Sequence, residues 1–307
     1  MIDRSTILRG PAVIQFNGCT FYSKGDITVD VGLETFQVET AAHGKVDERV
    51  IERSIKVKFT PAGEWENLAT LYPYGSAVLG ASVFGAVDLP LVIQTLSGRK
   101  ITFSSAAITQ MPAISLSSTK TLLGDVEFTC LGKNNEAWTT AGNSFAIAAQ
   151  AFSDATFDPA SILTQPYAAA WGAVAPWDAI KTFAGWEISF DLSLNPVTTD
   201  DDGIVDYTFA SLAVSASCQP MGITEQQFLD AMRLQGATNA RGRSLQAGAN
   251  DLVFTGTGVA ITIKKAQMKE GGMLFNPKDP RIATAKWIAT RQFIAGAAQP
   301  LFSVATS

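Results

Sequence analysis

The sequence has few of the residues on which most enzyme active sites depend. Its 307 residues include one histidine, His43, and three cysteines, Cys19, Cys130 and Cys218. A Ser–His–Asp or Cys–His arrangement would have to use His43, but the polar segment TAAHGKVD around it indicates a solvated loop histidine. The cysteines are far apart and stand among apolar or small residues, which indicates buried free thiols rather than a disulfide framework or a metal site. Because P-loop, paired-cysteine and H-E-x-x-H patterns are also missing, we expect no catalytic, cofactor-binding or metal site and a protein that is not an enzyme.

Long apolar runs and runs of one charge are lacking as well. No apolar stretch is long enough to span a bilayer, and the opening MIDRSTILRGPAV lacks the apolar run of a signal peptide. We therefore expect a chain that is made in the cytoplasm and has no membrane partner. The formal net charge of −5 is spread along the chain, and no basic tract points to specific nucleic-acid recognition. The composition, 47% hydrophobic and 17% charged, is sufficient for a substantial core, and the length suggests about two domains.

Three local patterns have an ordinary structural interpretation beside a functional one. Asp200-Asp201-Asp202-Gly203 could suggest calcium, but the spaced carboxylates and closing glutamate of a calcium loop are absent, so a turn between strands is favoured. Gly256-x-Gly258 lacks a third glycine and a following helix, which favours a hairpin turn over a dinucleotide site. Arg241-x-Arg243 and Lys264-Lys265 could contact an acidic partner, although a solvated face is the simpler interpretation.

The two halves of the chain are similar at an offset of about 160 residues. GDITVDVGL at 25–33 aligns with GWEISFDLSL at 185–194, which matches Asp30 with Asp191. Pro61-x-Gly63 aligns with Pro220-x-Gly222, and the segment that begins at Gly98 aligns with the one that begins at Gly258. We predict a tandem duplication with copy 1 at 1–140, a linker at 141–166 that includes a short helix at 146–152, and copy 2 at 167–307.

Each copy follows the same plan. A strand with apolar and polar residues in alternation leads into a long polar excursion, at 34–47 in copy 1 and 195–206 in copy 2, and a strand then returns. After Pro-x-Gly the spacing becomes helical, with Thr224 and Gln227 forming a capping box in copy 2. A hairpin and a last strand, near 126–130 and near 287–290, complete each copy. The predicted fold class is mainly β, a β-sandwich or partly open barrel with one flanking α-helix, tandemly duplicated.

This plan favours self-assembly. Open sheet edges are templates for pairing with another chain, and a ring of duplicated chains has twice as many domain positions as subunits. The polar excursions are poorly suited to a core, so we expect them to order on assembly and to contact the next ring in a stack. The candidate residues for these contacts are Glu34, Glu39, His43, Lys45, Asp47, Asn195, Asp200, Asp201, Asp202 and Asp206.

In its order of elements the sequence resembles bacteriophage tail tube (major tail) proteins. The opening GPAVIQFNG and the long hairpin in VETAAHGKVDERVIERSIKVKFTPAGEWENL have the character of long-tailed phage tube subunits. The duplicated form resembles members in which a trimer imitates a hexameric ring. The resemblance implies a structural protein of the virion, stacked with copies of itself around a tape-measure protein. It implies tail terminator and baseplate or hub proteins as further partners, and later passage of DNA through the channel without specific binding.

An acidic channel would keep the phosphate backbone of DNA from adhering to its wall. Asp30 and Asp191 are our candidates for the lumen, with outer solvent as the equal alternative for both. A different tail component that stops at a single ring is the first alternative function, and a cryptic hydrolase that uses His43 is a distant one. A glycan-binding sandwich is another alternative, because tryptophans could line a carbohydrate groove; their spread favours core or subunit-interface positions instead. These tryptophans are Trp65, Trp171, Trp177, Trp186 and Trp287.

Overall fold

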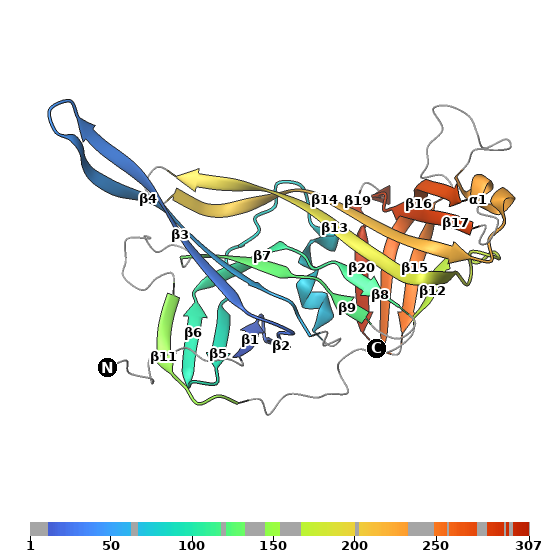
Figure 1. Cartoon of the computed structure of the whole chain (residues 1–307), viewed down its shortest axis with the longest axis horizontal. Coiled ribbons are helices and arrows are strands. Elements are labelled where there is room, and N and C mark those ends of the chain that lie inside the picture. The colour runs from blue at the N-terminus through green and yellow to red at the C-terminus, as the bar shows by residue number, and fades with distance from the viewer. Residues whose placement is uncertain are drawn as a thin grey trace.

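The chain folds mainly into β-strands, as the sequence predicts, and its sheets curl into a half-barrel (Figure 1). The structure is a computed structural model, and it describes residues 12–62, 67–117, 121–132, 145–153, 167–199, 203–232, 249–256, 258–274, 281–291, 293–294 and 297–306.

Copy 1 places two sheets against one another. The first has the order β11-β6-β5-β1-β2 and the second β3-β4-β10-β7, while a short β8–β9 hairpin leaves copy 1 and joins a sheet of copy 2. The strands of copy 1 are β1 (Ala12–Phe16), β2 (Cys19–Tyr22), β3 (Thr28–Thr40), β4 (Gly44–Phe59), β5 (Leu91–Thr95), β6 (Arg99–Phe103), β7 (Ser105–Gln110), β8 (Ile114–Leu116), β9 (Thr121–Leu123), β10 (Val126–Leu131) and β11 (Phe145–Ala149).

Copy 2 builds the corresponding layers with fewer and longer strands. Its long strand β16 bends, so that its first half pairs with β15 and β20 and its second half with β17. The strands of copy 2 are β12 (Ala168–Trp171), β13 (Lys181–Thr199), β14 (Gly203–Met221), β15 (Asn250–Gly256), β16 (Val259–Leu274), β17 (Arg281–Ile288), β18 (Phe293–Ile294), β19 (Ala297–Ala298) and β20 (Phe302–Thr306).

The pairing of strands follows a similar order in the two predicted copies. In copy 1, β5 pairs with β1, β6 with β11 and β4 with β10; in copy 2, β15 pairs with β12, the first half of β16 with β20, and β14 with β17. The registers agree as well, because Val57 pairs with Phe128 in copy 1 and Ala216 with Trp287 in copy 2, each about 160 positions later.

Matching irregularities of the two long hairpins give the most detailed evidence. The β3–β4 ladder shifts register between Glu34 and Thr35 and again between Val38 and Glu39. The β13–β14 ladder shifts at the corresponding places, between Ser193 and Leu194 and between Val197 and Thr198. Such bulges increase the local twist of a ribbon, so both hairpins are bent by bulges at corresponding positions.

The expectation that the polar excursions are loops is wrong. Residues 34–40 extend β3 and 44–47 begin β4, so the copy 1 excursion is a regular antiparallel ribbon with a turn at 41–43. In copy 2, Asn195 and Asp206 belong to the ribbon of β13 and β14. Both ribbons extend away from the packed layers (Figure 1). Their polar residues suit this arrangement because both faces of an extended ribbon meet solvent.

Three further expectations are corrected. The single helix predicted after Pro61 is a pair of 3-10 helices, η2 (Leu68–Leu71) and η3 (Pro73–Ser76), whereas copy 2 has the predicted α-helix, α1 (Glu225–Ala231), with its capping box at Thr224. The segment expected as a linker helix forms strand β11, which pairs with β6. The strand expected near 287–290 is β17, which begins earlier, at Arg281, and is followed by β18, β19 and β20, which the sequence does not predict.

One continuous core lies between the layers and passes from copy 1 into copy 2. Strand residues that alternate along β4, β10, β14 and β17 supply it, among them Val57, Phe128, Val214 and Trp287, all fully buried. The two copies are therefore packed as one body, and the junction between them is part of the fold.

Candidate assembly interfaces

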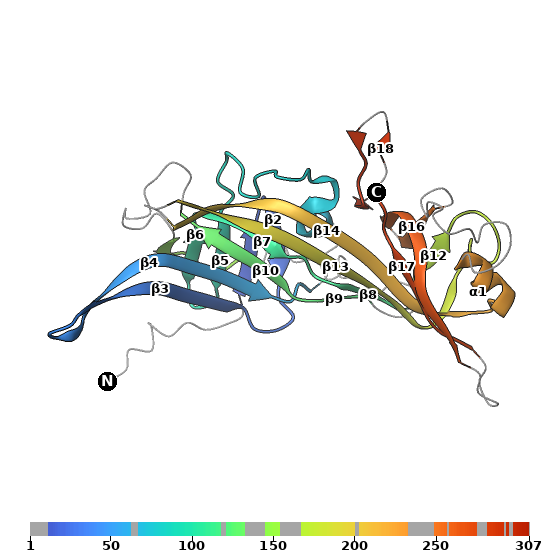
Figure 2. The same cartoon turned by 90° about the horizontal axis from the view of Figure 1, so that it is seen from above.

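The junction between the copies is a β-sheet that runs from one copy into the other. Strand β8 of copy 1 pairs antiparallel with β13 of copy 2, with Ile114 opposite Ile188 and Ser115 opposite Glu187. Figure 2 shows β8 and β9 lying alongside β13. Gly185 stands at this junction with a φ of +87°, and a Cβ atom there would lie 2.1 Å from the carbonyl oxygen of Leu116. The close approach of the two copies therefore requires glycine at this position.

A second contact joins residues 78–85 of copy 1 to the other edge of β14. The amides of Gly80 and Val83 donate to the carbonyls of Phe209 and Tyr207 at 2.9 and 2.8 Å, and the Phe209 amide donates to Ala81 at 2.9 Å. The Phe84 ring stacks on Tyr207, with ring centroids 6.3 Å apart. This part of copy 1 thus covers the edge of the copy 2 ribbon through an isolated antiparallel bridge between Ser82 and Thr208.

Aromatic packing closes the junction. Tyr72 of copy 1 contacts two rings of copy 2, Phe190 at 4.8 Å and Phe302 at 5.2 Å between centroids, and those two rings lie 4.8 Å apart. The Tyr72 hydroxyl donates to the carbonyl of Pro112 at 2.9 Å, and burial raises its pKa well above the ordinary value. Gly75 beside it leaves room for the backbone of Phe302, since a Cβ there would lie 2.3 Å from the Phe302 oxygen.

The outer edge of copy 1 carries exposed apolar side chains. Among the described residues, β3 pairs only with β4, so its second edge is unpaired. Val31 and Leu33 of β3 are 65% and 59% exposed, and Phe36 is 61% exposed. Strand β11 is exposed along its length, with Ile147 at 60%. Exposed apolar side chains along an unpaired strand are typical of a surface that binds another chain.

Each predicted ring-contact residue that the structure describes lies on a ribbon. Glu34 and Glu39 lie on β3, Lys45 and Asp47 on β4, and His43 in the turn between them, with Lys45 paired to Glu48 at 2.8 Å. In copy 2, Asn195 lies on β13, and the Asp206 carboxylate accepts the amide of Phe84 at 3.1 Å. Asp206 therefore serves the junction inside the chain. Asp200, Asp201 and Asp202 lie outside the described residues.

The face of the long sheets turned away from the core is polar. Its ion pairs join Lys56 to Glu127 at 3.2 Å and Lys58 to Asp125 at 3.1 Å. A depression of about 490 Å³ on this face is lined by Asp125, Glu127 and, from copy 2, Asp191. The Thr60 hydroxyl, followed by Lys58, lowers the pKa of Asp125, so this carboxylate stays charged.

The two predicted lumen residues lie on this polar face but are not structural counterparts. Asp30 pairs with Lys56 and Asp191 with Ala213, and the matched bulges make Ser189 the counterpart of Asp30. The sequence alignment of the first strand was therefore displaced by two residues. A displacement of two keeps a side chain on the same face of a strand, so both carboxylates still share that face.

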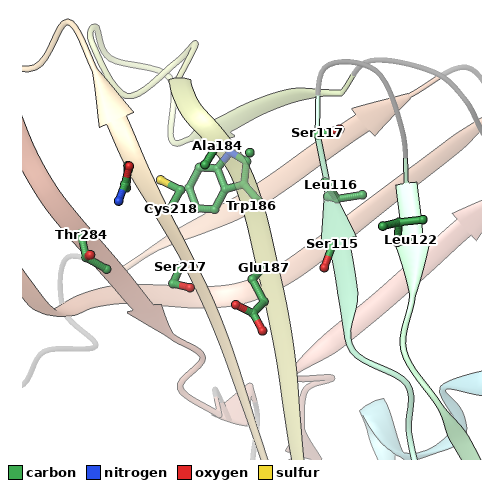
Figure 3. A pocket seen from close by; sticks show the side chains of 12 residues that line it. Ser115, Leu116, Ser117, Leu122, Ala184, Trp186, Glu187, Ser217, Cys218 and Thr284 are labelled. Carbon is green, nitrogen blue, oxygen red and sulfur yellow. The ribbon is translucent and has the colours of Figure 1, made fainter.

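A pocket of about 360 Å³ lies where the copies meet (Figure 3). It collects hydroxyl groups from Ser115, Ser217 and Thr284, together with the carboxylate of Glu187. The only histidine of the chain lies in the turn of the β3–β4 ribbon, and among the described residues no hydrogen bond joins one of these hydroxyls to the Glu187 carboxylate. Burial raises the pKa of the Cys218 thiol at the pocket wall, which disfavours the thiolate form.

The tryptophans of copy 2 form its core. Trp171, Trp186 and Trp287 are buried, and Trp177 packs edge-on against Trp171 with centroids 5.4 Å apart. Trp65 lies outside the described residues. Of the tryptophans that the structure describes, only Trp177 is partly exposed, so they form no exposed row that a sugar could cover.

The remaining local patterns are ordinary structural features. Gly256 and Gly258 flank the β15–β16 turn, and Lys264 is paired with Asp251 at 2.9 Å; Arg241 and Arg243 lie outside the described residues. Among the described residues there is no group of three or more histidine, cysteine or acidic side chains that could hold a metal ion. No helix in that part of the chain is long and apolar enough to cross a membrane. The chain matches no protein-family model, and no curated protein is detectably similar to it in sequence.

The residues that join the copies could not be identified from the sequence. Tyr72, Phe190 and Phe302 belong to three different elements, and residues 78–85 show no periodicity of strand or helix. A duplicated chain must join its copies somewhere, but strand pairing between distant segments leaves no local pattern.

Proposed function

We propose that the chain is a structural subunit that assembles with copies of itself into rings, and that the rings stack into the tube of a bacteriophage tail. One observation carries the proposal. The two copies are joined edge to edge through β8 and β13, while the outer edges of the same pair of copies, at β3 and at the end of β16, have no partner among the described residues.

Head-to-tail joining of such chains supports a ring. An interface between two different surfaces generates either a closed ring or an open filament, depending on the rotation from one unit to the next. The half-barrel curvature of the sheets supports closure, because continued curvature returns to its starting edge. A trimer of duplicated chains would contain six similar domains.

The long ribbons suit contacts along the tube. The β3–β4 ribbon extends beyond the packed layers (Figure 1), and it carries exposed apolar residues such as Phe36 and Val46 among charged ones. An exposed apolar residue on an extended ribbon has its best partner in a neighbouring ring.

The polar face of the long sheets is the side we assign to the channel. Asp30, Asp125, Glu127, Glu187 and Asp191 contribute carboxylates there, and several of them face Lys56 or Lys58. Excess carboxylate on the wall would repel DNA phosphates and allow the genome to pass without adhering.

Negative-stain electron microscopy of the purified protein over a concentration series tests the proposal. We expect hollow rings at low concentration and stacked tubes at high concentration. Discrete rings that never stack would instead indicate a distal tail, hub or terminator component. A monomer at every concentration would refute self-assembly and with it the tube.

A further inference from the structure

The junction between the two copies has a counterpart at the two ends of the chain. Resting on the proposed ring assembly, we infer that neighbouring chains join through the end of β16 and the edge of β3, in the register that β8 and β13 use inside the chain. The partner that binds the exposed edge of β3 is thus another molecule of this protein. It binds with the end of its strand β16.

The hairpins that carry the two junction strands correspond residue by residue. Ile114 pairs with Leu123 in the β8–β9 hairpin, and Met273 pairs with Ile282 between β16 and β17, each about 160 positions later. The end of β16 is therefore the counterpart of β8. Among the described residues its outer edge has no partner, whereas β8 is bound to β13.

The partner strands correspond in the same way. The matched bulges of the ribbons make Thr28 of β3 the counterpart of Glu187 of β13. Since Glu187 lies opposite Ser115, and Leu274 is the counterpart of Ser115, Thr28 of one chain lies opposite Leu274 of the next. Val29 then lies opposite Met273, as Ile188 lies opposite Ile114.

Differences in exposure between counterparts identify what the partner covers. Phe302 of β20 is 4% exposed because it packs on Tyr72 and Phe190, whereas its counterpart Phe145 of β11 is 42% exposed. The pairs that define this match are Phe302 with Ile263 and Phe145 with Phe103.

Counterparts on β13 and β3 differ in exposure in the same way. Phe190 is partly buried at the junction inside the chain, and its counterpart Val31 is 65% exposed. Joining two chains by the same rule brings Val31 and Phe145 of one chain to the end of helix α1 of the other. There Ala231 and Met232 are partly buried apolar residues in the place that Tyr72 takes in copy 1.

The new cluster would repeat the Tyr72–Phe190–Phe302 contact with different side chains. The cluster needs no rearrangement of the chain, because Val31 and Phe145 are exposed and Ala231 and Met232 are partly exposed. Covering these apolar surfaces supplies a favourable free energy for association that the isolated chain does not have.

Disulfide cross-linking in the register just derived tests the inference. Thr28→Cys with Leu274→Cys replaces two exposed residues, so the double variant should fold as the unaltered chain does. Residues directly opposite on antiparallel strands have Cβ atoms about 4.5–5.5 Å apart, close to the separation that a disulfide requires. Oxidised assemblies of this variant should run on a non-reducing gel as covalent oligomers, and reduction should return them to monomers.

Two controls accompany this experiment. Ser115→Cys with Glu187→Cys tests the same geometry inside one chain and should give a cross-linked monomer. Glu34→Cys with Leu274→Cys moves the β3 partner six residues along the strand, about 20 Å, and should give few oligomers.

If rings form but Thr28→Cys with Leu274→Cys yields no more oligomer than the displaced pair, the inferred junction is wrong while the proposed function stands. If no oligomer forms at any concentration under electron microscopy, both are wrong. Covalent oligomers from the in-register pair alone support both.

Discussion

At the scale of single residues, the same side chain has different roles in the two copies. Phe145 and Phe302 occupy corresponding places on β11 and β20, but only Phe302 is buried in the chain. A residue's contribution to stability follows its burial, so equivalent positions should respond differently to substitution.

Phe302→Ala should therefore lower the free energy of unfolding of the isolated chain by about 3–5 kcal/mol, the usual cost of emptying a core phenylalanine site. Phe145→Ala should cost less, about 1–2 kcal/mol, because this side chain is 42% exposed, while weakening assembly. Chemical denaturation of the dilute monomer gives the first quantity, and light scattering over a concentration series gives the second. Equal loss of monomer stability in both variants would contradict the assignment of Phe145 to an interface.

The cysteines give a second residue-scale prediction. Burial raises the pKa of Cys130 to about 12 and that of Cys218 still further, so at pH 8 both remain neutral thiols. Since the thiolate is the reactive species, a thiol reagent should label at most Cys19, which is partly exposed, in the folded protein. All three should react after denaturation; rapid labelling of two or three thiols in the native state would show that Cys130 or Cys218 is not enclosed.

At the scale of elements, the sequence predicts the strands of the two long hairpins, both short hairpins, β10 and β17, and it misses about half of the described strands, most of them short. The β5–β6 hairpin, β10 and helix α1 with its capping box are where alternation, turn residues and capping indicate them. The sequence predicts loops at the ribbon ends because an extended ribbon exposed on both faces has no apolar side. For strand β11, with the sequence FAIAA, the sequence predicts a linker with a helix because alanine favours helices, whereas the strand is stabilised mainly by pairing with β6.

The copy 1 helix was predicted too long for a reason that the sequence contains. Pro73 follows Tyr72, and a residue before proline is disfavoured in the α region. Tyr72 has φ −128° and ψ 58°, so the helical turn at Leu68–Leu71 ends there and a new one begins at Pro73. Copy 2 has no proline at the corresponding place and forms α1.

The candidate interfaces could be predicted only in outline. Duplication and unpaired edges pointed to self-association, and the polar-face position of Asp30 and Asp191 was anticipated. The residues that join the copies depend on tertiary pairing between distant segments, such as 78–85 with β14. No local rule of propensity or spacing determines such pairing.

Gly185 tests the junction between the copies. In Gly185→Ala the new Cβ would meet the Leu116 carbonyl, and a non-glycine residue at φ +87° is strained by about 1–3 kcal/mol before that clash is counted. We expect a loss of at least that size in the free energy of unfolding, measured with urea. Gly25→Ala is the matched control, because nothing lies within 4 Å of a Cβ there, and it should unfold like the unaltered chain. Equal stability of the two variants would mean that β8 and β13 are not held together as described.

At the scale of the whole molecule, the chain contains one complete junction, between β8 and β13. The edge of β3 and the end of β16 would be the two halves of a junction between neighbouring chains. The two predicted copies share a core and a sheet, and the edges at β3 and at the end of β16 have no partner among the described residues. Identical chains joined by one repeated rule give a closed ring when the curvature permits. Ring formation therefore depends on whether the β3 edge of one chain joins the β16 edge of the next.

Native mass spectrometry of the purified protein tests this most directly, because it counts chains in the smallest assembly. The account predicts a dominant species of three chains, roughly 98 kDa from a chain of 32.6 kDa, together with multiples of that mass as rings stack. A spectrum that contains only the 32.6 kDa monomer at every concentration would contradict it.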